Sequence, residues 1–320
     1  MKDTILYYSI GALLYCPANN LSIVPSLVNE TFGTQFSLAL CLEDTIRDEL
    51  VMEAEKDLNH SLHQLSEESQ TKNFYLPKIF IRVREPRQIG RIYHLLQDVA
   101  SLITGFIVPK FSLANADDYI SEILRVNETS SHAIYMMPIL ESPTMINLQT
   151  RYDILYGLKN KLDHISQLVL NIRVGGNDLC HNFGFRRHSN ESIYEVLPVA
   201  GILADIFTVF GMEYVVSGPV WEYYSGKNWK EGLEKELRLD QLNGFVGKTV
   251  IHPNQIAIVN QGLSVAEADY EDAASILNWN ADLAGLVSGS SHKERMNEFK
   301  THHNWAKKIM MLSQLYGIKK

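Results

Sequence analysis

Residues 167–179 read QLVLNIRVGGNDL, and this stretch decides the fold. It begins with an apolar, β-branched run, which is typical of a strand buried on both faces of a parallel sheet. It ends in two glycines followed by Asn177 and Asp178, so a carboxylate comes directly after the strand. Because α/β proteins keep their chemistry at the carboxyl ends of their strands, Asp178 is a candidate functional residue.

A second segment has the same arrangement. Residues 133–140 are apolar and are followed by Glu141, Ser142 and Pro143. The sequence therefore predicts that Glu141 and Asp178 lie at matching ends of two consecutive strands.

Apolar runs alternate with amphipathic segments along most of the chain. The predicted strands are 11–16, 37–42, 78–83, 105–108, 133–140, 168–174, 214–216 and 249–251. The predicted helices between and after them are 21–32, 46–65, 88–102, 114–125, 145–162, 192–210, 229–241 and 253–259. Eight strands in strict alternation with helices indicate an α/β fold of the (β/α)8 TIM-barrel type. A doubly wound open sheet is the alternative, but no GxGxxG motif follows the first strand.

The pattern changes after Gly262. Two helices are predicted, at 266–286 and 293–316, with a small polar loop at 288–291 between them. We therefore expect a barrel at 1–262 and a C-terminal helical extension at 263–320, which covers the barrel mouth or packs on a neighbouring subunit.

Composition narrows the class of protein. Hydrophobic residues make up 46% and charged residues 21% of the chain, as in ordinary globular proteins. The net charge of −8 argues against a nucleic-acid partner. The apolar stretch at 5–15 is too short for a membrane span, and the three cysteines form no CxxC pair. These features predict a cytoplasmic protein with no nucleic-acid or membrane partner.

Charged residues follow most of the predicted strands. They are Glu43 and Asp44, Arg84, Lys110, Glu141 and Asp178. Carboxylates from neighbouring strands are the usual ligands of Mg²⁺, whereas zinc would require His or Cys spacings that are missing. Arg84 and Lys110 would then neutralise a substrate carboxylate or phosphate.

Each of these residues also has an ordinary interpretation. Asp178 fits a helix cap, Glu141 the start of a helix, and Arg84 a surface ion pair. Arg186 lies in a basic cluster that is either a solvated loop or a contact for the phosphates of a CoA ester. The convergence of the strand-end charges on one face of a barrel favours a functional site.

Seven motifs occur in order between residues 14 and 255. They are LYCPAN at 14–19, LED at 42–44, VR at 83–84, PK at 109–110, PILESP at 138–143, GNDL at 176–179 and GFVGKTVIHPNQ at 244–255. On these motifs the chain resembles the citrate lyase beta-subunit-like branch of the HpcH/HpaI aldolase superfamily. The resemblance implies a Mg²⁺-dependent barrel that makes or breaks C–C bonds in CoA esters or small oxo acids.

The resemblance also implies roles for individual residues. Glu141 and Asp178 would bind Mg²⁺, while Arg84 would bind substrate and stabilise an enolate. The resemblance further implies that Glu43 and Asp44 hold metal-bound waters or the arginine. From the residues themselves, we take Arg84, Glu43, Asp44 and Glu298 as candidate catalytic groups and Arg84, Lys110, Asn177 and Arg186 as candidate substrate-binding groups. Members are commonly trimers or hexamers, so a homo-oligomer is expected. A Met-x-Asp motif in the tail can cover a neighbouring active site, and Met296-Asn297-Glu298 occupies the comparable place here.

One departure from the family pattern raises a second hypothesis. The family's Asp-Gly-Pro reads Ser217-Gly218-Pro219 in this chain, so one acid is missing. The leading hypothesis is a Mg²⁺-dependent carbon–carbon lyase or aldolase that acts on a small hydroxy or oxo acid, or on its CoA ester. The alternative is a catalytically silent barrel that serves as a binding or assembly subunit.

Overall fold

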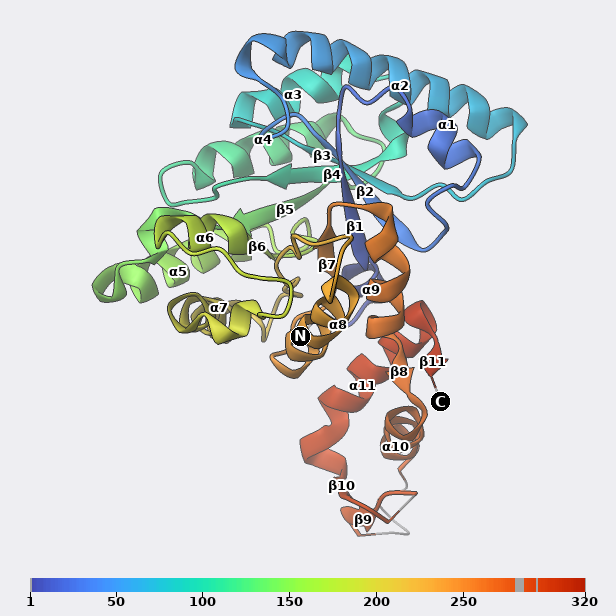
Figure 1. Cartoon of the computed structure of the whole chain (residues 1–320), viewed down its shortest axis with the longest axis vertical. Coiled ribbons are helices and arrows are strands. Elements are labelled where there is room, and N and C mark those ends of the chain that lie inside the picture. The colour runs from blue at the N-terminus through green and yellow to red at the C-terminus, as the bar shows by residue number, and fades with distance from the viewer. Residues whose placement is uncertain (1, 280–284, 292, 320) are drawn as a thin grey trace.

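The computed structural model describes residues 2–279, 285–291 and 293–319, and its centre is a parallel β-sheet (Figure 1). The strands are β1 (Ala12–Pro17), β2 (Phe36–Cys41), β3 (Lys78–Arg82), β4 (Ile103–Val108), β5 (Tyr135–Leu140), β6 (Arg173–Val174) and β7 (Lys248–Val250). Their order in the sheet is β6-β5-β4-β3-β2-β1-β7. Because neighbouring strands are parallel, their carboxyl ends all lie at the same edge.

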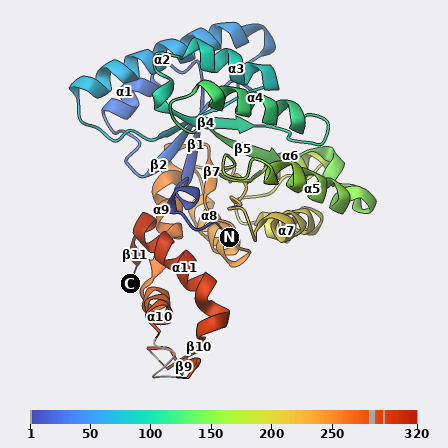
Figure 2. The same cartoon turned by 180° about the vertical axis from the view of Figure 1, so that it is seen from behind.

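Helices cover the outer face of this sheet (Figures 1 and 2). They are α1 (Ile23–Val28), α2 (Val51–Thr71), α3 (Pro86–Leu95), α4 (Ala116–Thr129), α5 (Leu148–Asp163), α6 (Gly176–Asn182), α7 (Leu197–Phe210), α8 (Trp229–Leu242) and α9 (Ile256–Leu263). The inner face has its own apolar layer, with Leu13, Ala39, Phe80, Ile107 and Met137 contributed by β1 to β5. Both faces of the strands are therefore buried, which explains their almost continuous apolar sequences.

Closure by eight strands was predicted, but within the described residues the sheet contains seven and its ladder is open. The predicted strand 214–216 makes only isolated bridges, from Val216 to Ile172 and from Gly218 to Lys248. The segment is short because a turn precedes it, and Pro219, which has no N–H to donate, follows it. The segment lies between β6 and β7 without forming a continuous ladder.

The C-terminal extension contains more than the two predicted helices. Its elements are β8 (Val265–Ala266), α10 (Glu267–Leu277), β9 (Val287–Gly289), β10 (Met296–Glu298), α11 (Phe299–Tyr316) and β11 (Ile318–Lys319). Part of the predicted loop at 288–291 is strand β9, and the last helix begins at Phe299 instead of residue 293. Residues 280–284 of the predicted helix 266–286 lie outside the described part of the chain.

The extension docks at the amino-terminal end of the sheet. The Tyr316 hydroxyl donates a hydrogen bond of 2.6 Å to the Tyr8 carbonyl, just before β1, and β11 pairs with β8. The rest of the extension projects away from the barrel, with the β9–β10 hairpin at its tip (Figures 1 and 2). The described part of the extension therefore does not cover the mouth of its own barrel, because the mouth lies at the carboxyl ends of the strands.

None of the helices within the described ranges is both long and apolar enough to cross a membrane.

Gly11 provides a test of how the extension is attached. Gly11 has a φ of +59°, and a Cβ placed there would lie 3.2 Å from the Tyr316 ring. We expect Gly11→Ala to lower the free energy of unfolding by more than the roughly 1–2 kcal/mol that a left-handed residue costs by itself. Gly33→Ala is the matched control, since Gly33 has a φ of +75° with nothing within 4 Å. Equal losses for both variants in urea denaturation would show that the Tyr316 contact is unimportant.

Candidate active site

A cavity of about 290 Å³ lies at the carboxyl ends of the strands. It is lined by Tyr15, Asp44, Thr45, Arg82, Ile139, Glu141, Arg173, Val174, Gly175, Gly176, Asn177, Asp178, Val220, Thr249 and Ile251. The lining includes three acids and two arginines from segments that are far apart in sequence, so the parallel sheet collects these charges at one place.

Arg82, the last residue of β3, is the central cation of this cluster. Its Nη2 lies 2.7 Å from Glu43 Oε2, 3.0 Å from Asp44 Oδ2 and 3.8 Å from Glu141 Oε1. Lys110 adds a second cation, with its Nζ 2.6 Å from Glu43 Oε1 and 3.4 Å from Asp44 Oδ1. Burial would raise the pKa of Asp44, but its hydrogen bond with Glu43 and the charges of Arg82 and Lys110 outweigh burial and lower it.

Glu141 is buried, and its surroundings shift its pKa in the opposite direction from that of Asp44. Its side chain accepts a hydrogen bond of 2.9 Å from the backbone N–H of Lys110, a residue held in the left-handed region with a φ of 50°. Burial, followed by the negative charge of Asp178, raises the pKa of Glu141 to about 8, although Arg82 acts in the opposite direction. A cation beside Glu141 would stabilise its ionised form against both burial and the charge of Asp178.

Asp178 reaches the cavity from the first turn of α6 and is partly exposed. Its carboxylate has no hydrogen-bond or ion-pair partner within the described residues. The backbone approaches Glu141 closely at Gly175, where a Cβ would lie 1.9 Å from Glu141 Oε2. Glycine is thus required for the end of β6 to lie against this carboxylate.

Two oxygen-donor carboxylates facing one cavity suit a hard cation such as Mg²⁺, which keeps several of its waters. Within the described ranges, no group of three or more His, Cys, Asp or Glu side chains is arranged to hold a metal. A cation held by Glu141 and Asp178 would therefore take its other oxygens from water and substrate.

Comparison with known proteins identifies the family. A family model described as C–C bond lyase of the TIM-barrel fold matches residues 4–318, which is nearly the whole chain. The chain belongs to this family. The protein is therefore a C–C bond lyase, and the solved structures described next share the fold of the citrate lyase beta-subunit-like proteins that the sequence resembles. No curated protein matches its sequence.

Solved structures show how far the fold of this lyase is shared. A citrate lyase from Burkholderia xenovorans LB400 has a TM-score of 0.71 at 13% identity, covering 97% of this chain and 93% of its own. CitE from Mycobacterium tuberculosis, solved with magnesium, acetoacetate and coenzyme A, has a TM-score of 0.63 at 14% identity. The match covers 97% of this chain and 100% of the CitE chain. The citrate lyase beta subunit of M. tuberculosis with oxaloacetate and magnesium has a TM-score of 0.54 at 16% identity, covering 81% and 99%. At these identities the likeness shows the fold.

Arg84 does not lie where the sequence analysis expects. Its Nε donates to the Leu42 carbonyl at 2.6 Å, its Nη2 to the carbonyls of Glu43 and Ile46, and its Nη1 to Asp48. The chain has left β3 at this point, so the side chain turns to the loop after β2 and does not line the cavity. Arg82 occupies the position among the acids, while Arg84 holds the loop that carries Glu43 and Asp44.

The other predicted site residues divide into two groups. Asn177 lines the cavity, and Lys110 contacts the Glu43 and Asp44 carboxylates without lining it. Arg186 lies outside the cavity. Its side chain is 83% exposed, and its Nε lies 3.6 Å from Glu222 Oε2. Glu298 is on β10 at the tip of the extension, where its carboxylate accepts from Thr301. The structure therefore does not bring Arg186 and Glu298 into this cavity.

Arg82 and Arg173 lie within strands, so a prediction based on the residue after each strand does not include them. Both are charged residues inside otherwise apolar strands, in IFIRV and LNIRV. A buried strand rarely contains an unpaired charge, so this interruption was the available signal.

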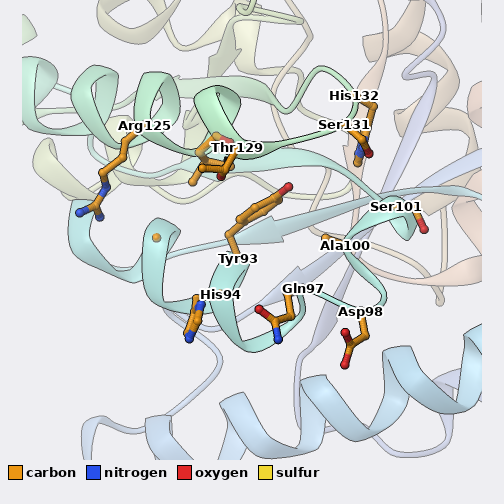
Figure 3. A pocket seen from close by; sticks show the side chains of 12 residues that line it. Tyr93, His94, Gln97, Asp98, Ala100, Ser101, Arg125, Thr129, Ser131 and His132 are labelled. Carbon is orange, nitrogen blue, oxygen red and sulfur yellow. Dashed lines mark hydrogen bonds between the residues drawn. The ribbon is translucent and has the colours of Figure 1, made fainter.

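Another hollow lies elsewhere, between α3 and α4 (Figure 3). It has a volume of about 680 Å³ and includes His94, Asp98, Arg125 and His132 in its lining. His94, Asp98 and Arg125 are exposed, and His132 Nε2 is already 3.1 Å from the Ile103 carbonyl. This hollow therefore lacks the buried, converging charges of the strand-end cavity.

The raised pKa of Glu141 predicts a pH-dependent stability of the metal-free protein. The native state binds an extra proton between about pH 4.5 and 8, because the folded pKa is higher than the unfolded one. Stability should therefore fall as the pH rises through this window. In EDTA, Glu141→Gln should show a flatter dependence of the free energy of unfolding on pH, measured by urea denaturation. Identical slopes for the two proteins would contradict this assignment.

Proposed function

We propose that this lyase is a Mg²⁺-dependent enzyme that cleaves or forms a C–C bond in a small oxo or hydroxy acid through an enolate. The observation that carries the proposal is the pair Glu141 and Asp178 beside Arg82 in one cavity. The magnesium in the M. tuberculosis relatives supports it, as do the small acids bound there.

The bound metal would act as a Lewis acid on a substrate carbonyl or carboxylate oxygen. Glu141 and Asp178 would hold the metal, with the Lys110 N–H orienting Glu141. Arg82 would stabilise the negative charge that develops on the enolate oxygen. Glu43 and Asp44 fix Arg82 in place through the two ion pairs described above.

A retro-aldol cleavage requires a base and then an acid. The base removes the hydroxyl proton, the O–H electron pair becomes the new carbonyl bond, and the broken C–C pair forms the enolate, which is then protonated. Of the two candidate acids on the loop after β2, Asp44 lines the cavity and Glu43 does not. Asp44 is therefore the better placed protein group for proton transfer.

The cavity volume favours a small acid as the reacting part of the substrate. A second hollow of about 350 Å³ also contains Asn177, together with Arg186 and His181 in its lining. In a CoA ester, the reacting acyl group would occupy the first cavity and the longer carrier would have to extend past Asn177. We further propose a cytoplasmic homo-oligomer, in which Glu298 contributes only to the site of a neighbouring copy.

The silent-subunit alternative has less support from the site. Ser217 replaces the acid of the family pattern, but Glu141, Asp178 and a central arginine are all present at one cavity. A barrel that serves only in assembly has no need to bring these carboxylates together at one cavity.

Calorimetric titration of the metal-stripped protein with Mg²⁺ tests the metal site. We expect binding that tightens at least tenfold with pyruvate or oxaloacetate present, because the substrate completes the coordination shell. Glu141→Gln and Asp178→Asn should abolish binding, whereas Asp117→Asn, which removes an exposed acid paired with Lys161, should not change it. Absence of Mg²⁺ binding under every condition would support the silent-subunit alternative.

The two arginines provide a second test. Arg82→Gln should weaken Mg²⁺-dependent binding of pyruvate on the order of 10- to 100-fold, because charged hydrogen bonds to the acid are lost. Arg84→Gln should mainly lower thermal stability, because it releases the carbonyls of the loop after β2. Equal effects of both variants on ligand affinity would contradict the assignment of Arg82 as the substrate-binding arginine.

A further inference from the structure

Arg173 is a buried cation without an acidic partner. Its side chain lines the cavity at β6, yet the residue is only 2% exposed. Its guanidinium donates to Thr249 Oγ1 at 2.6 Å, Ser217 Oγ at 3.3 Å and Asn171 Oδ1 at 3.5 Å. All three acceptors are neutral, and no carboxylate in the described part of the chain forms an ion pair with Arg173.

The other buried arginines show how unusual this arrangement is. Arg82 pairs with Glu43, Arg151 with Asp205 at 2.7 Å, and Arg187 with Glu236. Burial lowers the pKa of Arg173, but a guanidinium remains protonated in proteins. An uncompensated buried charge is strongly unfavourable, so an anion from outside the chain would stabilise it.

Unused hydrogen-bond donors around Arg173 also indicate an anionic ligand. Its own Nε and the Nδ2 of Asn171 are buried without an acceptor in the structure, and so is the Nε of Arg82. All three groups are donors, so a ligand that reaches them would supply acceptor oxygens. Two of these donors belong to arginines that line the same cavity as Glu141 and Asp178.

We infer that Arg173 binds a second carboxylate of the substrate, and that the substrate is a dicarboxylic oxo or hydroxy acid of four or five carbons. This inference rests on the proposed function, because the first carboxylate and its neighbouring oxygen would occupy the metal site beside Arg82. The second carboxylate would then extend toward β6 and β7, where Arg173 and Thr249 lie. The cavity of about 290 Å³ suits a small acid of this length.

A purely structural role for Arg173 makes different predictions. Its bond to Thr249 joins the ends of β6 and β7, which the segment 214–218 also bridges. If this bond were the whole purpose of Arg173, its removal would destabilise the fold and weaken all ligands alike. Selectivity between acids therefore separates the two roles.

The test compares oxaloacetate with pyruvate, which lacks the second carboxylate, in calorimetric titrations at saturating Mg²⁺. Wild-type protein should bind oxaloacetate at least tenfold more tightly. Arg173→Met should weaken oxaloacetate binding on the order of 10- to 100-fold and leave pyruvate binding within about threefold. Arg173→Lys, which keeps the charge, should retain part of the preference. Arg151→Met is the control, because it removes a buried arginine that does not line the cavity.

Ser217→Asp tests the same inference without removing the arginine. An aspartate at this position would place a carboxylate beside Arg173 and compete with the ligand, so the preference for oxaloacetate should be lost. Pyruvate binding should persist. Thermal unfolding without ligand shows whether each variant is folded.

Three results would overturn the inference. They are equal affinity of the wild type for the two acids, equal weakening of both acids by Arg173→Met, or a full preference for oxaloacetate in Arg173→Met. In each of these cases pyruvate still binds with Mg²⁺, so the proposed function stands. Failure of both acids to bind to wild-type protein with Mg²⁺ would overturn the proposed function and this inference together.

Discussion

The guanidinium of Arg82 holds the site together. One of its nitrogens lies between Glu43, Asp44 and Glu141, which come from the loops after β2 and β5. Glu43 and Glu141 are buried while Asp44 is exposed, and the planar, permanently charged guanidinium offsets the repulsion among these three carboxylates. Lys110 also forms ion pairs with Glu43 and Asp44, so the negative charges of those two acids are balanced by two cations.

Glu141 and Asp178 are not compensated in the same way. Arg82 is farther from Glu141 than from Glu43, and Asp178 has no partner within the described ranges of the chain. Burial, followed by the nearby charge of Asp178, raises the pKa of Glu141. Two acids of the cavity, Glu141 and Asp178, thus lack a close cation, and its buried cation, Arg173, forms no ion pair with a described carboxylate. A metal ion together with an anionic substrate would satisfy both requirements.

The sequence predicted much of this site, because the order of strands and the residues that follow them can be read directly. Glu43, Asp44, Glu141 and Asp178 follow strands of a parallel sheet, and the structure places their loops at one edge. The two arginines were harder to assign. A side chain at the last residue of β3 points into the barrel, whereas Arg84, two residues later, belongs to a loop whose direction no periodicity describes. The position of Glu298 was also beyond sequence reasoning, because the docking of α11 under β1 depends on contacts such as that between Tyr316 and Tyr8.

By itself the sequence determined the class of fold, the family, and the acids at the strand ends, since these follow from local patterns of apolar and charged residues and from short motifs. Only the tertiary structure shows which arginine lies among the acids, which buried cation pairs with no carboxylate of the described residues, and that the ladder between β6 and β7 is interrupted. These properties depend on distances between residues that are remote in sequence, such as 3.8 Å from Arg82 to Glu141. Such distances result from the packing of the whole barrel, and no local pattern encodes them.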